Sequence, residues 1–81
     1  MRVTVRLFAT LRDAAGRPET DRQCPDPSTV ETVWDDVVRE WPALGPFRAG
    51  ISCAVNAEYA RFTTPVRDGD EVAFLPPVSG G

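Results

Sequence analysis

Hydrophobic and polar residues alternate strictly at the start of the chain. Val3, Val5 and Leu7 fall on one side of an extended backbone, and polar residues stand between them. A period of two is typical of a strand that buries one face, so residues 2–8 are predicted to form a strand. A connection over residues 13–18 follows, and residues 19–24 are predicted to return as a second, mostly polar strand of a hairpin.

A helical period replaces the alternation after Pro27. Ser28 stands three residues before Glu31, which is the spacing of a capping box, and Pro42 is expected to end the helix. The valines in this stretch have low helix propensity, so the helix is expected to depend on packing against the sheet. The apolar stripe that would make this contact, and that assigns both tryptophans to the core, comprises Val30, Val33, Trp34, Val37, Val38 and Trp41.

Shorter elements are predicted for the rest of the chain. Residues 42–50 contain two prolines and two glycines and are expected to form a loop with Phe47 buried. Asn56 and Ala57 suit a turn, and Asp68-Gly69-Asp70 is a stronger turn signal. In the last strand Val72 and Phe74 are expected to point inward, and Ala73 and Leu75 outward. The strands expected here are residues 51–55, 58–62 and 71–75.

This order predicts one helix crossing a mixed sheet. A right-handed connection leaves the first and last strands as parallel neighbours. The predicted fold class is α+β, a ubiquitin-like β-grasp with a mixed sheet of four to five strands packed on one main helix. The chain is too short for a second core, so we expect one domain over residues 1–75 and a flexible C-terminal tail over residues 76–81.

Composition restricts the possible functions. The formal net charge is −3, which argues against binding to nucleic acid or to anionic membranes. All nine basic residues are arginine and histidine is absent, so the chain has no Schiff-base amine and no imidazole acid or base. A self-contained enzyme with a bound cofactor is therefore not expected.

The two cysteines and the apolar segments indicate a cytoplasmic protein. Cys24 and Cys53 have a spacing that fits neither a metal clip nor a redox pair, so we expect reduced thiols packed in or near the core. Residues 1–6 interleave charge with apolar residues and lack the apolar run of a signal peptide. No stretch approaches the about 20 apolar residues of a membrane span.

The candidate chemistry lies at the C-terminus. Two prolines stop the last strand, two glycines resist ordering, and six extended residues reach about 20 Å. Such a tail could pass through a narrow channel and present its carboxylate to a distant active site, where activation as an acyl-adenylate and attack by sulfur would give a thiocarboxylate. A Gly-Gly end alone carries little weight, but it gains weight from the β-grasp pattern before it. The tail residues are Pro76, Pro77, Val78, Ser79 and Gly80, with Gly81 as the residue that carries the chemistry.

Residues 68–81 closely resemble the C-terminal signature of the family of molybdopterin synthase small subunits. Ala54-Val55-Asn56 and residues 5–12 also resemble that family, so the likeness covers nearly the whole chain. The absence of lysine and the prolines at positions 42 and 46 depart from the family's pattern. They leave the tail chemistry intact but put in doubt any contact that used a lysine.

The resemblance implies a sulfur carrier for molybdenum cofactor biosynthesis. An adenylyltransferase similar to ubiquitin-activating enzymes would use ATP to join AMP to Gly81, and a sulfur donor would convert the carboxylate to a thiocarboxylate. The tail would then insert into the large synthase subunit, which would supply the catalytic side chains and pass the sulfur to cyclic pyranopterin monophosphate. A heterotetramer, two small subunits on a large-subunit dimer, is also implied.

Several residues and functions have competing interpretations. Asp68 and Asp70 could suggest a metal site, but a solvated turn is favoured because no third ligand follows, and Asn56 is assigned to a turn. Phe8 and Leu75 are predicted to form part of an exposed apolar patch that docks the large subunit, against ordinary partial burial at strand ends. Alternative functions are a sulfur carrier for another product, such as the thiamine thiazole, and a ubiquitin-like modifier of target lysines.

Overall fold

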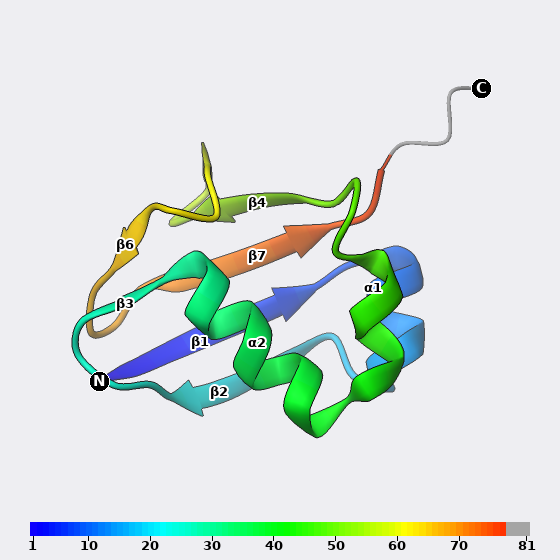
Figure 1. Ribbon diagram of the computed structural model, residues 1–81, viewed down its shortest axis with the longest axis horizontal. Coiled ribbons are helices and arrows are strands. Elements are labelled where there is room, and N and C mark those ends of the chain that lie inside the picture. Colours follow the sequence, from blue (N-terminus) through cyan, green and yellow to red (C-terminus); the bar gives the residue numbers. More distant parts are fainter. Residues whose placement is uncertain (78–81) are drawn as a thin grey trace.

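A five-stranded mixed sheet forms the centre of the computed structural model, which describes residues 1–77 (Figure 1). The first and last strands are parallel neighbours at its middle, and every other pair in it is antiparallel. This arrangement confirms the predicted α+β, β-grasp class. In spatial order the strands are β2 (Glu19–Gln23), β1 (Arg2–Leu7), β7 (Glu71–Leu75), β4 (Ser52–Val55) and β5 (Glu58–Ala60).

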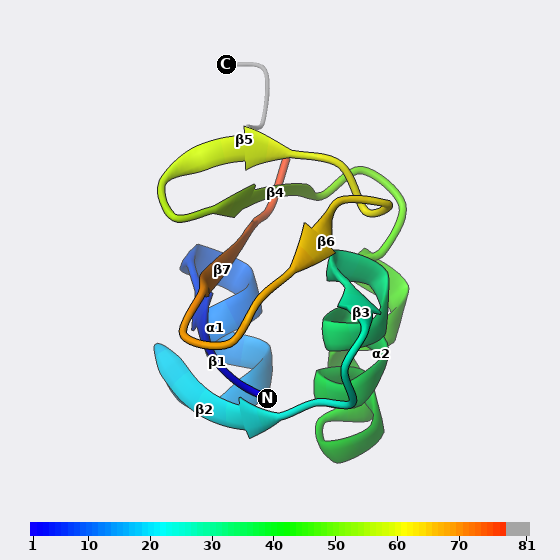
Figure 2. The same ribbon diagram turned by 90° about the vertical axis from the view of Figure 1, so that its left-hand side faces the viewer.

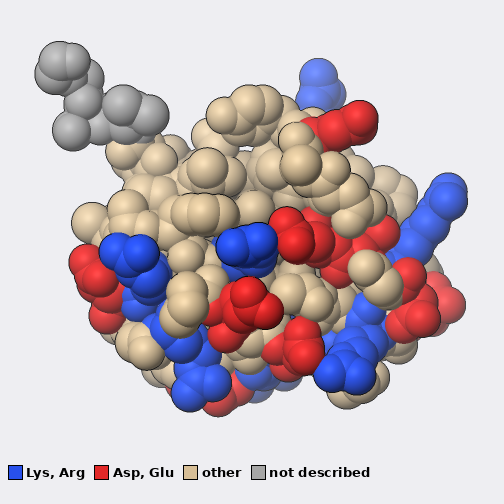
Figure 3. All heavy atoms as spheres, turned by 180° about the vertical axis from the view of Figure 1, so that it is seen from behind, with Lys and Arg blue, Asp and Glu red and all other residues tan. Residues whose placement is uncertain are grey.

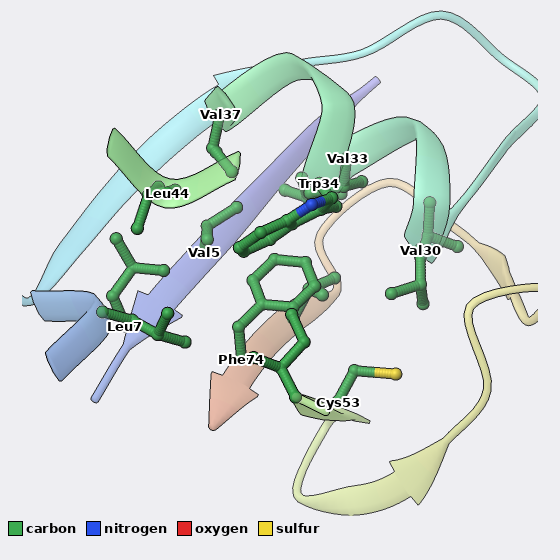
Figure 4. Packing of buried hydrophobic residues seen from close by; sticks show 14 of the residues in the cluster. Val5, Leu7, Val30, Val33, Trp34, Val37, Leu44, Cys53 and Phe74 are labelled. Atoms are coloured by element: carbon green, nitrogen blue, oxygen red, sulfur yellow. The ribbon is translucent and has the colours of Figure 1, made fainter. Parts of the chain in front are cut away.

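Helix α2 (Val30–Glu40) covers one face of the sheet and leaves the other face open (Figure 2). Trp34 meets Phe74 of β7 edge-on, with 4.9 Å between the ring centroids (Figure 4). Trp34 is buried as predicted. Trp41, which was also predicted to lie in the core, is only half-buried. The guanidinium groups of Arg17 and Arg22 lie over its ring, 5.1 and 5.5 Å from the ring centroid.

The start of α2 differs from the prediction by one residue. Thr29 is the N-cap: its Oγ1 accepts from the Thr32 N–H at 3.4 Å, and Thr32 Oγ1 accepts from the Thr29 N–H at 3.3 Å. The predicted Ser28–Glu31 box is therefore wrong. Ser28 lies in strand β3 (Ser28–Thr29), which pairs with β6 (Pro65–Val66), and this tertiary contact keeps its backbone extended.

Two helical segments occupy stretches for which no helix was predicted. Helix α1 (Ala9–Ala15) buries Leu11 and Ala15. Its last turn is closed by the Gly16 N–H, which donates to the Arg12 carbonyl at 2.8 Å, and the φ of 78° at Gly16 turns the chain out of the helix. Phe8 consequently caps this helix instead of ending β1. The predicted loop at residues 42–50 contains a 3-10 helix, η1 (Pro42–Phe47), which buries Leu44, while Phe47 is only half-buried.

Both cysteines are free and buried, as the sequence predicts. Burial raises the pKa of the Cys24 and Cys53 thiols above the usual range, which keeps them in the neutral form. None of the helices in the described part of the chain has the length and the apolar run that crossing a membrane requires.

Candidate functional site

The central strand β7 leads directly to the C-terminal tail. Val72 and Phe74 are buried and pair with β1 and β4 on either side, so the strand is anchored along its length. Pro76 and Pro77 follow, and neither has an N–H with which to continue the ladder. The chain therefore leaves the sheet directly after Leu75.

The first two residues of the tail, Pro76 and Pro77, form what we call the tail root. The tail root lies beside the segment that enters β4. A Cβ placed on Gly50 would be 3.8 Å from Cγ of Pro77, in ordinary van der Waals contact. Pro76 is half-buried and Pro77 is exposed. The other predicted tail residues, Val78, Ser79, Gly80 and Gly81, lie outside the described residues, and the division of the chain at residue 75 stays a prediction.

An apolar groove lies on the open face of the sheet next to the tail root. Phe8 and Leu75 both line it, because β1 and β7 run parallel in a register that pairs Leu7 with Phe74. Phe8 is 39% exposed and Leu75 is half-buried. The charge distribution on this side shows a continuous uncharged surface near the end of the described chain (Figure 3). We call the apolar residues that line the groove the open-face patch: Phe8, Ala54, Ala57, Tyr59, Ala73 and Leu75.

Charged residues border this patch. The guanidinium of Arg6 lies 5.8 Å from the ring centroid of Phe8, and its NH1 is 3.8 Å from Oε2 of Glu71. An apolar centre with a polar rim is the composition of protein interfaces. The structure thus brings Phe8 and Leu75 together as predicted, while their role in docking stays a prediction.

Sequence reasoning missed Tyr59, the most exposed large apolar side chain of the patch at 83%. Tyr59 stands opposite Ala54 in the β4–β5 pair, on the face that α2 does not cover. Three residues of β5 are too few for alternation to be read reliably. The pairing of Ala54 with Tyr59 across the predicted turn was the signal that could have placed it.

The side chain of Asn56 links the turn at residues 56–57 to the turn at residues 68–70. Its Oδ1 accepts from the Glu71 N–H at 2.9 Å, and its Nδ2 donates to Oδ1 of Asp70 at 3.0 Å. Asp70 Oδ2 also accepts from the Arg67 N–H at 2.8 Å, and Gly69 has a φ of 88°. The structure confirms that Asn56 and Asp70 serve turns. No group of three or more potential metal ligands is present among residues 1–77.

The described part of the site is suited to binding and not to bond making. The groove offers only apolar side chains, one carboxylate and one phenol, and it is a surface feature of a small domain. The described geometry thus places an apolar groove beside the start of the tail, since its lining includes Leu75, the residue directly before Pro76.

Comparison with known proteins gives one family and several similar proteins. The ThiS family matches residues 5–81. The molybdopterin synthase sulfur carrier subunit of Arabidopsis thaliana is 35% identical, over 98% of this chain and 82% of the relative. The crystal structure of SAMP1 from Haloferax volcanii covers all of both chains at 30% identity with a TM-score of 0.90. A chain of the BexX/CysO complex of Amycolatopsis orientalis is also similar, at 28% identity and a TM-score of 0.74 over 98% of this chain and 99% of that one.

Proposed function

Because the chain belongs to the ThiS family, we propose that it is the sulfur carrier subunit of a molybdopterin synthase and that the carboxylate of Gly81 carries the sulfur. The resemblance drawn from residues 68–81 is confirmed by the family match. The observation that carries the proposal is that this match runs to Gly81, along a chain whose central strand ends directly at the tail root. No residue of the open-face patch is required for the chemistry itself.

The proposed chemistry has three covalent steps on Gly81. A carboxylate oxygen attacks the α-phosphorus of ATP, pyrophosphate leaves, and an acyl-adenylate forms. The terminal sulfur of a persulfide donor then attacks the acyl carbon and AMP leaves. A thiol finally attacks the donor's sulfur in the resulting acyl disulfide, so that the S–S bond breaks, the thiocarboxylate is released and the thiol forms a new disulfide with the donor. ATP belongs to the activating enzyme, and the carrier needs no cofactor of its own.

The proposed partners follow from this chemistry. We propose an adenylyltransferase, a sulfur donor and the large synthase subunit, with two carriers on a large-subunit dimer, acting in the cytoplasm. A chain of similar structure has been crystallised in the BexX/CysO complex, which supports binding to a partner protein. The sulfur would pass to cyclic pyranopterin monophosphate within the large subunit.

Intact mass spectrometry tests the function. The protein is incubated with the adenylyltransferase of its genome, ATP, a persulfide donor and a thiol, and a parallel sample lacks ATP. We expect a mass increase equal to the replacement of one oxygen by sulfur, only in the sample with ATP, and located on the C-terminal peptide. An unchanged mass with an enzyme that adenylates a known carrier would contradict the proposal.

Charge placed in the open-face patch should weaken docking. The Phe8→Asp, Leu75→Asp double variant is expected to lower affinity for the large subunit about thirtyfold or more, because it places two carboxylates in an apolar interface. Isothermal titration calorimetry would measure this, with Gln23→Asp, Thr63→Asp as a control that adds the same charge at exposed positions outside the patch. Equal affinity of both variants, each folded by circular dichroism, would show that the patch is not the docking surface.

A protein modifier is the second candidate, and the structural similarity to SAMP1, a small archaeal modifier protein, favours it. A modifier would form an isopeptide bond between Gly81 and a lysine of a target. Because this chain has no lysine, it could not form lysine-linked chains with itself. The two functions are separated by affinity purification from cells: a modifier appears in conjugates of raised mass, whereas a sulfur carrier is recovered as the free chain.

A further inference from the structure

The segment beside the tail root is held by one arginine. Arg48 follows η1, and its guanidinium donates to both carboxylate oxygens of Glu31 in α2, from Nε at 3.0 Å and from NH2 at 2.8 Å. Hydrogen bonding to Arg48 lowers the pKa of Glu31 below its usual range, so the carboxylate stays charged at neutral pH. A two-point contact of this kind restricts the orientation of the guanidinium as well as its position.

The same guanidinium also contacts the aromatic part of the core. Its central carbon lies 3.6 Å from the ring centroid of Phe62, and Phe62 stacks on Phe74 with 6.1 Å between the centroids. Arg48 is thus connected to α2 through Glu31 and to β7 through Phe62 and Phe74. These contacts place residue 48 relative to the strand that carries the tail.

The sheet itself does not hold the residues between Arg48 and β4. The pairing of β4 with β7 ends where Ser52 meets Leu75, two residues after Gly50. Gly50 has a φ of 100°, a conformation that other residues adopt only with strain, and a Cβ placed on it would be 3.8 Å from Cγ of Pro77. Arg48 on one side and the buried Ile51 on the other therefore determine where the Gly50 backbone lies.

We infer that Arg48 is a positioning residue for the tail: through Glu31 and Phe62 it holds the Gly50 backbone beside Pro77 and so sets the direction in which the chain leaves the sheet. This inference rests on the proposed function, because the direction matters only if the terminus must enter a partner's active site. The open-face patch, which is the proposed docking surface, lies on one face of the sheet, whereas Glu31 belongs to the helix on the opposite, covered face. Positioning and docking are therefore separable.

Steady-state adenylation kinetics can separate them. The Arg48→Gln variant is expected to lower kcat for adenylation about tenfold and to leave KM within about twofold, because it misdirects a docked tail without weakening docking. Arg48→Lys keeps the charge but loses the two-point contact, so its kcat should fall between that of the unsubstituted protein and that of Arg48→Gln. The control is Arg39→Gln, since Arg39 is 79% exposed and approaches Asp36 only to 3.8 Å.

A structural readout accompanies the kinetics. In the unsubstituted protein and in Arg39→Gln, NMR should show a nuclear Overhauser effect between the Gly50 Hα and the Pro77 ring, and in Arg48→Gln this effect should weaken. If Arg48→Gln does not fold, Glu31→Gln is measured instead, since it retains the contact with Phe62. An unchanged kcat, or a rise in KM alone, would overturn the inference. Absence of adenylation in the unsubstituted protein would overturn the proposed function, even with the Gly50–Pro77 contact present.

Discussion

Deletion of Gly81 should abolish thiocarboxylate formation while the domain stays folded and continues to bind its partner. The deletion moves the reactive carboxylate back by one residue, which is at most about 3.6 Å of extended chain. Reacting groups must approach within about 3–3.5 Å in the correct orientation, so a shift of this size removes the carboxylate from the attacking position. All residues of the open-face patch lie between Phe8 and Leu75 in the sequence, so the deletion does not change the patch.

Two measurements check this prediction. Intact mass after incubation with the adenylyltransferase, ATP and the sulfur donor should show no gain of sulfur, and calorimetry should show binding to the large subunit within about threefold of the full chain. A chain extended by one alanine after Gly81 is the matched control, because it changes the reach by the same amount in the other direction. Sulfur gain by the deletion variant would mean that the terminal position does not determine the chemistry.

Replacement of Phe74 by alanine should remove a large part of the stability of the domain. Phe74 is fully buried, meets Trp34 edge-on and stacks on Phe62. Truncation of a buried Phe costs about 3–5 kcal/mol, from lost transfer energy and the cavity left behind. A domain of 81 residues is expected to have a free energy of unfolding of only about 4–12 kcal/mol.

Urea unfolding followed by tryptophan fluorescence would measure the change, because Trp34 lies against the deleted ring. The control is Phe8→Ala, which makes the same chemical change at a side chain that is 39% exposed and should cost about 1 kcal/mol or less. Equal losses in the two variants would show that the Trp34–Phe74 contact is not the centre of the core.

Neighbouring residues of β7 serve different purposes. Phe74 points into the core and Leu75 points to the open face, because side chains alternate along a strand. Stability and the proposed docking are therefore assigned to alternate positions of one strand. For this reason the Phe74→Ala and Leu75→Asp variants should give separate phenotypes although the residues are adjacent.

The elements that the sequence predicted best are those with a long periodic pattern. Val3, Val5 and Leu7 predicted β1, and the stripe from Val30 to Val37 predicted α2 with its buried face. In both cases every apolar position repeats the same period, and the burial of the apolar face stabilises the element in the fold. The match of the chain to the ThiS family confirms the resemblance drawn from residues 68–81.

Short elements were missed because their stability comes from distant residues. Helix α1 has only Leu11 and Ala15 as buried positions, which is too little pattern to recognise in seven residues. Strand β3 exists only because β6 pairs with it, and that pairing moved the cap of α2 from Ser28 to Thr29. Local propensity is a weak signal wherever tertiary contacts decide the conformation.

The sequence by itself determined the parts of this protein that depend on local order: the periodic strands and helix, and a composition without lysine and histidine, which excludes a Schiff-base amine and an imidazole acid or base. Only the tertiary structure decided which surface lies beside the strand that leads to Pro76 and Pro77. Tyr59 joins Phe8 and Leu75, and Arg48 reaches Glu31 and Phe62, across separations in the chain that no short pattern records. Such contacts form only when the sheet and helix have packed, since packing brings distant residues within contact distance.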